Sequence, residues 1–105
     1  MKLIDFQGIP NTDAAHQSGV VSSTALTLLS LLAAGALHPN TKFVRFCVDD
    51  ADLRYTVQGT PPTTSLGRRV AYDSAVVLSR EEADLCQLIR ATATNAVVQI
   101  MQYKQ

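Results

Sequence analysis

The sequence of 105 residues contains no tryptophan, few other aromatic residues and only two cysteines. Cys47 and Cys86 stand far apart, without the C-x-x-C spacing of a zinc or redox site. Isolated thiols of this kind are typical of small buried hydrophobic residues. A disulfide between them is the alternative, although nothing in the chain indicates an oxidising compartment. The cysteines therefore predict neither a metal site nor a redox site.

The chain also has no excess of charge of either sign. Nine basic residues balance nine acidic ones, and no tract rich in lysine or arginine occurs. Arg68 and Arg69 form the single adjacent basic pair, which we interpret as a solvated loop or strand face. This balance argues against binding nucleic acid through phosphate neutralisation.

Long hydrophobic runs are absent as well. The longest apolar stretch, residues 26–37, is too short to cross a bilayer, and it lacks the basic flank of a secretory signal. We therefore expect no membrane span and no export. The stretch predicts a strand followed by a turn, and a single short helix ending at Gly35 is the alternative.

Residues that carry chemistry do not gather into a recognisable motif. Asp49, Asp50 and Asp52 lack the glycine and the distal glutamate of a calcium loop. His16 and His38 have no metal-ligating or orienting partner at a recognisable spacing. Neither a nucleophile elbow nor a glycine-rich phosphate loop occurs. We expect no enzyme, no metal and no cofactor.

Most of the chain reads as short strands. Leu53, Tyr55 and Val57 alternate with polar residues, which is the period of a strand with one solvated face. The same pattern and a high content of valine predict the other strands, which cover residues 42–48, a return strand reaching Val70, residues 70–78 with a break at Asp73-Ser74, residues 85–92 and residues 96–103.

One helical turn is expected within this series. Ser79 followed by Glu82 three residues later forms the pattern of a capping box. Short strands in sequence with short connections indicate antiparallel pairing in two packed sheets. The predicted fold class is all-β: an antiparallel β-sandwich over residues 24–105, immunoglobulin-like or jelly-roll-like, with at most one or two short helical turns.

The connection after residues 53–57 has the composition of a shaped loop. Gly59 tolerates the positive φ that a tight turn requires, and Pro61-Pro62 fixes two φ angles where a ladder cannot continue. The run Leu-Arg-Tyr-Thr-x-x-Gly-Thr-x-Pro-Thr, followed by Gly67 and a second strand, resembles a motif of small bacteriophage virion proteins. It is also similar to a run in the immunoglobulin-like modules of chitin- and hexosamine-degrading enzymes. Both families usually carry Asp before the glycine, where this chain has Gln58.

The N-terminal segment differs from the rest of the chain. Gly, Pro, Asn and Asp interrupt any periodicity over residues 1–23, which predicts an extended arm with Ile4, Phe6 and Ile9 as its apolar residues. A frayed terminus and an arm that orders on a partner are both consistent with this composition.

The phage resemblance, which spans residues 41–103, implies a virion structural protein. The expected role is a decoration or cement protein on the capsid surface, made in the host bacterial cytoplasm, with the major capsid protein as partner and a homo-oligomer on a symmetry axis. The alternatives are another head or tail component and a carbohydrate-associated module, which the scarcity of aromatics disfavours. The residues expected to contact partners are Ile4, Phe6, Ile9, Thr60, Pro61, Pro62, Thr63, Arg68 and Arg69.

Overall fold

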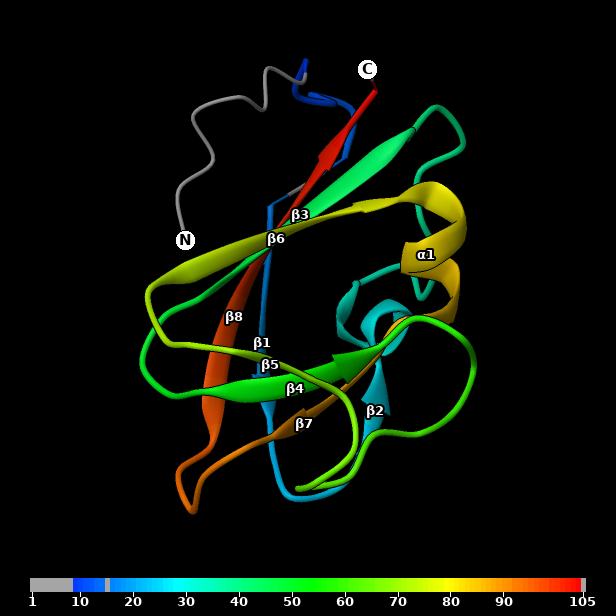
Figure 1. The fold of residues 1–105 in the computed structure, drawn as a ribbon. Helices are drawn as coiled ribbons and strands as arrows, with labels where there is room; N and C mark the ends of the chain where they lie inside the picture. Colours follow the sequence, from blue (N-terminus) through cyan, green and yellow to red (C-terminus); the bar gives the residue numbers. More distant parts are fainter. Residues whose placement is uncertain (1–8, 15, 105) are drawn as a thin grey trace.

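The computed structural model describes residues 9–14 and 16–104, which form two antiparallel four-stranded sheets packed face to face (Figure 1). The predicted β-sandwich is therefore confirmed. Sheet A contains, in spatial order, β1 (Gln17–Val21), β8 (Ala96–Tyr103), β3 (Phe43–Val48) and β6 (Ser74–Ser79). Sheet B contains β2 (Leu26–Thr27), β7 (Gln87–Arg90), β4 (Leu53–Thr56) and β5 (Arg68–Val70).

The pairing of the strands is nested. β1 pairs with β8, β2 with β7, β3 with β6 and β4 with β5, so the chain forms one long hairpin that is rolled into a sandwich. An immunoglobulin-like sandwich would place its first two strands in one sheet. Here β1 and β2 belong to different sheets. The connectivity is that of an eight-stranded jelly roll, one of the two expected forms.

The core lies between the sheets and follows the alternation of the strands. Val44, Phe46 and Val48 of β3 are buried, whereas Arg45 and Cys47 between them are partly exposed. The rings of Phe46 and Tyr55 from β4 pack in a T-shaped arrangement, with the ring centroids 5.7 Å apart. Because Phe46 belongs to sheet A and Tyr55 to sheet B, this contact links the two sheets across the core. Burying a large apolar side chain contributes about 1.5 to 3 kcal/mol to the free energy of unfolding.

Two short helices connect strands. The predicted capping box is present at α1 (Arg80–Leu85), where Ser79 Oγ accepts from the Glu82 amide and Glu82 Oε1 accepts from the Ser79 amide. Within the apolar run, the predicted strand is confined to Leu26–Thr27. The 3-10 helix η1 (Leu28–Leu31) follows it. Thr27 Oγ1 caps this helix by accepting from the Ser30 amide, and Leu28 is fully buried.

The described part of the N-terminal segment differs from the arm expected over residues 1–23. Gln17–Val21 forms β1, and Val21 is fully buried. Gly19 interrupts the sequence pattern for a packing reason: a Cβ there would lie 2.6 Å from Leu31 Cδ2. Pro10 bridges to Tyr103, which extends the contact with β8 toward the N-terminus. Residues in this segment therefore belong to the sandwich.

The two cysteines are free: Cys86 is fully buried and Cys47 is partly exposed. Asp73 adopts a φ of 64°, which interrupts the extended backbone between β5 and β6 at the predicted position. Within residues 9–14 and 16–104, no helix has the length and apolar character needed to cross a membrane.

Candidate interaction site

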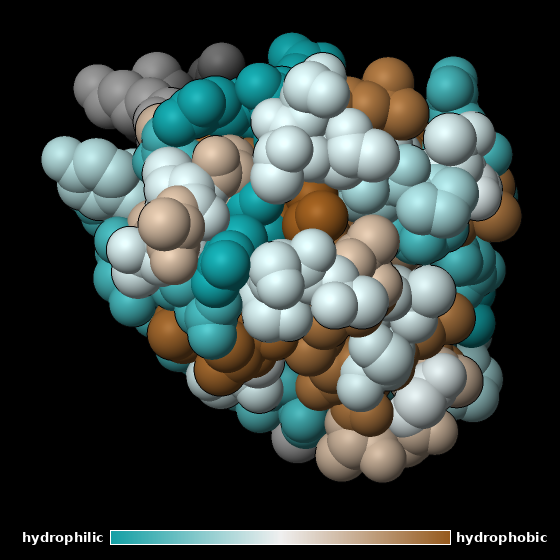
Figure 2. All heavy atoms as spheres, turned by 90° about the horizontal axis from the view of Figure 1, so that it is seen from below, coloured by the Kyte–Doolittle hydropathy of each residue, from teal (hydrophilic) through white to brown (hydrophobic). Residues whose placement is uncertain are grey.

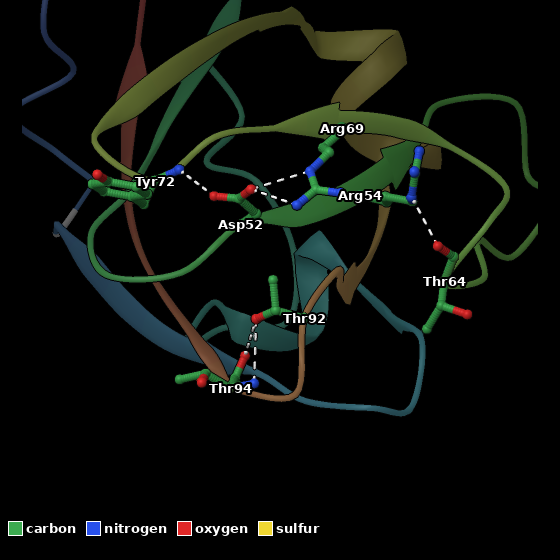
Figure 3. A network of polar contacts seen from close by, with 7 residues as sticks. All are labelled: Asp52, Arg54, Thr64, Arg69, Tyr72, Thr92 and Thr94. Atoms are coloured by element: carbon green, nitrogen blue, oxygen red, sulfur yellow. Dashed lines mark hydrogen bonds and ion pairs between the residues drawn. The ribbon is translucent and has the colours of Figure 1, made fainter.

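The connection between β4 and β5, residues 57–67, is called the motif loop here. It is fastened to sheet B by the guanidinium of Arg54. Arg54 Nε donates to the carbonyl of Thr64 at 3.0 Å, and Nη1 donates to the carbonyl of Gly67 at 2.8 Å (Figure 3 shows the contact with Thr64). A guanidinium presents several donors in a fixed plane, so one side chain holds two points of the loop.

Thr63 organises the tip of the motif loop. Its Oγ1 accepts from the amides of Leu66 at 2.9 Å and Ser65 at 3.2 Å, and its amide donates to the carbonyl of Leu66 at 2.9 Å. Hydroxyl side chains stabilise turns through such local bonds to the backbone. The expected shaped loop is thus an ordered turn with its own internal bonds.

Both glycines of the motif loop are required by the backbone. Gly59 has a φ of 84° and Gly67 a φ of 121°, a region that L side chains rarely adopt. A Cβ at Gly67 would also lie 3.1 Å from the carbonyl oxygen of Tyr55 and 3.2 Å from Pro62 Cβ. The carbonyl of Gly59 accepts from Gln87 Nε2 at 3.2 Å, which attaches the start of the loop to β7.

The motif loop exposes most of the residues expected to contact partners. Thr60, Pro61 and Thr63 are exposed as expected, but Pro62 is buried. Pro62 lies beneath Gly67 and so supports the loop from below, which corrects its assignment to a contact surface. Leu66, half of whose surface is exposed, is an apolar residue at the tip that the sequence analysis did not single out.

Arg68 and Arg69 follow the loop and are both exposed. Arg69 donates to Asp52 Oδ2 from Nη2 at 2.7 Å and from Nε at 3.1 Å, and Asp52 Oδ1 accepts from the Tyr72 amide at 2.9 Å (Figure 3). The bonds from Arg69, and then that from the Tyr72 amide, lower the pKa of Asp52. This ion pair orients the guanidinium at the surface.

Arginine is concentrated on sheet B despite the neutral total. Arg54 and Arg69 lie directly opposite each other in the β4–β5 register, Arg68 begins β5, and Arg90 ends β7. None of the four strands of sheet B contains an acidic residue, and Asp52 immediately precedes β4. The neutral total therefore conceals an excess of arginine in sheet B. Arg54 and Arg69 share one face, whereas Arg68 pairs with Tyr55 and Arg90 with Leu53 on the other.

The apolar residues expected in the N-terminal arm are only partly accounted for. Ile4 and Phe6 lie outside the described residues. Ile9 is about half exposed, and its carbonyl accepts from the Lys104 amide at 3.0 Å. Its side chain is thus available at the end of sheet A, whereas the motif loop lies beside sheet B.

The histidines and clustered aspartates serve local structure. His16 Nε2 lies 2.9 Å from Gln99 Oε1, and Asp50 Oδ1 accepts from the Val97 amide at 3.0 Å. Asp49 Oδ2 accepts from Gln99 Nε2, also at 3.0 Å. Over the part of the chain that the structure describes, no group of three or more His, Cys, Asp or Glu side chains is placed to hold a metal ion.

Two residues central to this site, Arg54 and Asp52, were not predicted from the sequence to belong to it. A polar residue in an alternating strand is ordinarily solvated, so Arg54 carried no separate signal. Its available signal was its place within the motif, ahead of a loop rich in Gly, Pro and Thr whose carbonyls need donors.

Hydrophobic residues on the face seen in Figure 2 lie in small groups separated by polar ones. The site therefore consists of an ordered polar loop with one exposed leucine and neighbouring arginines.

Comparisons of this chain with models of protein families, with curated proteins and with solved structures found no match.

Proposed function

We propose that this protein is a bacteriophage virion structural protein that decorates or cements the capsid. One observation supports this function best: the residues that carry the resemblance are those that build the motif loop. Arg54 holds two of its carbonyls, Thr63 forms its turn, and Gly59 and Gly67 adopt its positive φ angles. The motif positions thus shape the loop of this chain, and the exposed residues between them are free to suit a particular partner.

The proposed mechanism is the burial of surface across neighbouring major capsid protein subunits. Separating the subunits then requires breaking the contacts of the bridging protein as well. A loop already held by Arg54 and Thr63 loses little conformational freedom on binding, which favours affinity. Oligomerisation multiplies the contacts and adds avidity. The role requires no enzymatic activity, cofactor, nucleic acid or membrane, and it places the protein on the capsid surface after synthesis in the host bacterial cytoplasm.

The test is binding to purified capsids that lack the protein. We expect Leu66→Asp, which puts a charge at the loop tip, to weaken saturation binding at least tenfold while the circular dichroism spectrum and melting temperature stay unchanged. Val20→Asp is the matched control, because Val20 is equally exposed but lies on β1. Equal binding of wild type and Leu66→Asp would place the contact elsewhere, and absence of any saturable binding would contradict the capsid role.

A carbohydrate-associated module is the second candidate, and one observation favours it. Tyr72 is 63% exposed and stands beside the Asp52–Arg69 pair. An exposed aromatic ring next to fixed polar groups is a combination that suits stacking and hydrogen bonding to a sugar. Saturable binding of a chito-oligosaccharide that Tyr72→Ala abolishes would support this candidate over the capsid role.

A further inference from the structure

Strand β6 forms an open edge of sheet A. It pairs with β3 alone, and the Arg80 amide donates to the Lys42 carbonyl at 3.0 Å at the end of that register. Antiparallel strands bond through alternate residues. Counting back from the bonded residue Arg80, the backbone N–H and C=O groups of Leu78 and Val76 point toward β3. The N–H and C=O groups of Ala75 and Val77 consequently point away from β3, toward the edge.

This edge lacks the features that usually block pairing with another chain. β6 is the longest of the four edge strands, and its sequence Ser-Ala-Val-Val-Leu-Ser contains no charge and no proline. By contrast β5, at the neighbouring edge of sheet B, is three residues long and carries two arginines. Long, uncharged edges are where additional strands join a sheet.

An open groove of about 410 Å³ lies along this edge, between β5 and β6. Its lining combines apolar side chains, among them Tyr55, Val70 and Val76, with Arg68 and Arg69. We propose that the N-terminal segment of a second copy of this chain, residues 3–7, adds to β6 as a strand in this groove.

The sequence of that segment suits the groove. In an extended strand Ile4 and Phe6 lie on one side and Asp5 on the other. The two apolar side chains match the core side of the edge, where Val76 packs against the core. Asp5 then faces the outer side, where Arg45 lies opposite Val77 and makes no ion pair with any residue that the structure describes.

The segment must come from another copy because its own groove is out of reach. Residues 9–11 pair with the end of β8 on the side away from β3. A strand added beyond β6 is four strand spacings away, about 19 Å. Phe6 is three residues from Ile9, which spans about 10 Å at full extension. Pairing β6 with β6 of a second copy is disfavoured, because it would bring the arginines of the two β5 strands together.

The proposal is tested by complementation between two full-length variants in sedimentation velocity. The arm variant, Ile4→Asp with Phe6→Asp, keeps an intact groove. The groove variant, Val77→Pro, keeps an intact arm but removes an edge N–H that an added strand would bond, while the bonds between β6 and β3 stay in place. We expect wild type to associate with increasing concentration and each variant alone to remain monomeric. A one-to-one mixture is expected to form a heterodimer, because one functional arm then meets one functional groove.

Val20→Pro, which removes an edge N–H on the opposite edge of sheet A, is the matched control and is expected to associate as wild type does. A wild type that stays monomeric at about 100 μM, an arm variant that still associates, or a mixture that gives no heterodimer would each overturn the proposal. The assay contains no capsid, so its outcome is independent of the proposed capsid role.

Discussion

Sheets A and B differ in strand length and in the charged residues that their strands carry. The strands of sheet A contain five, eight, six and six residues and carry one arginine as their only charged residue. Those of sheet B contain two, four, four and three residues and carry four arginines, with the motif loop between two of them. Sheet A therefore supplies most of the ladder and register, whereas the short strands of sheet B hold a loop and charges at the surface.

The nested topology explains how the motif loop can vary while the rest of the fold is kept. β4 and β5 form the innermost pair of the rolled hairpin, so the loop between them can vary without altering the pairs outside it. Most of the buried core lies outside the loop. A loop in this position can therefore be specialised for a partner at little cost to the core.

The largest effect is expected from a core residue of sheet A. Phe46→Ala should lower the free energy of unfolding by about 3 to 5 kcal/mol, because the ring is fully buried and packs against Tyr55 across the two sheets. Leu66→Ala, in the motif loop, should change it by less than about 0.5 kcal/mol. Denaturant midpoints with equal m-values measure both, and similar losses at the two positions would remove the distinction between sheets.

The sequence predicted the two central strands of sheet A better than the N-terminal strand of the same sheet. Alternation located β8 at residues 96–103 and β3 within one residue, because long strands with one buried face leave a clear pattern. β1 was missed because Gly19 looks like an interruption, whereas it makes room for Leu31. Close packing between segments distant in sequence leaves no local signal.

The candidate site was predictable in outline and not in detail. Glycine and proline marked the motif loop, since they act on the backbone locally. The burial of Pro62 and the two bonds from Arg54 depend on how the loop folds back over sheet B, which composition does not encode. The choice between jelly roll and immunoglobulin-like order depends likewise on long-range pairing.

The conformation of the motif loop is tested by its second glycine. Gly67→Ala should cost about 1 to 3 kcal/mol, because it adds a Cβ close to the Tyr55 carbonyl in a backbone region with positive φ. Gly35→Ala is the matched control: Gly35 also has positive φ, but a Cβ there meets nothing within 4 Å. A larger loss at Gly35 than at Gly67 would contradict the described packing of the loop against sheet B.

Removing the guanidinium that fastens the loop should have a somewhat smaller effect. Arg54→Ala deletes two hydrogen bonds, which corresponds to about 1 to 2 kcal/mol. Hydrogen exchange of the Leu66 amide should accelerate while amides of β8 keep their protection. Uniform acceleration in both sheets would mean that the loop and the core unfold together.

Alkaline pH should lower the stability of the fold through the buried thiol of Cys86. Burial raises the pKa of Cys86, before β7, to about 12, whereas the thiol ionises near 9 in the unfolded chain. Stability from this group is complete below pH 9 and declines as pH rises toward 12, by about 1 kcal/mol at pH 10. Comparing the pH dependence of the stability of wild type with that of Cys86→Ala isolates this contribution. Equal slopes in wild type and Cys86→Ala would show that the thiol is not desolvated.

The smallest effect is expected at the Asp52–Arg69 pair beside sheet B. The pKa of Asp52 is lowered by its bonds with Arg69, so its stabilising contribution is present above the unfolded pKa of about 3.8 and is lost as pH falls through the folded value. Because the pair is exposed, salt should weaken it. Asp52→Asn should therefore flatten the loss of stability below pH 4 at low salt, and 0.5 M NaCl should reduce the difference from wild type. Asp84→Asn, at an exposed position on α1, is the control. If Asp52→Asn and wild type lost stability in parallel on acidification, the pair would merely orient Arg69 at the surface, and the charge asymmetry between the sheets would matter for binding alone.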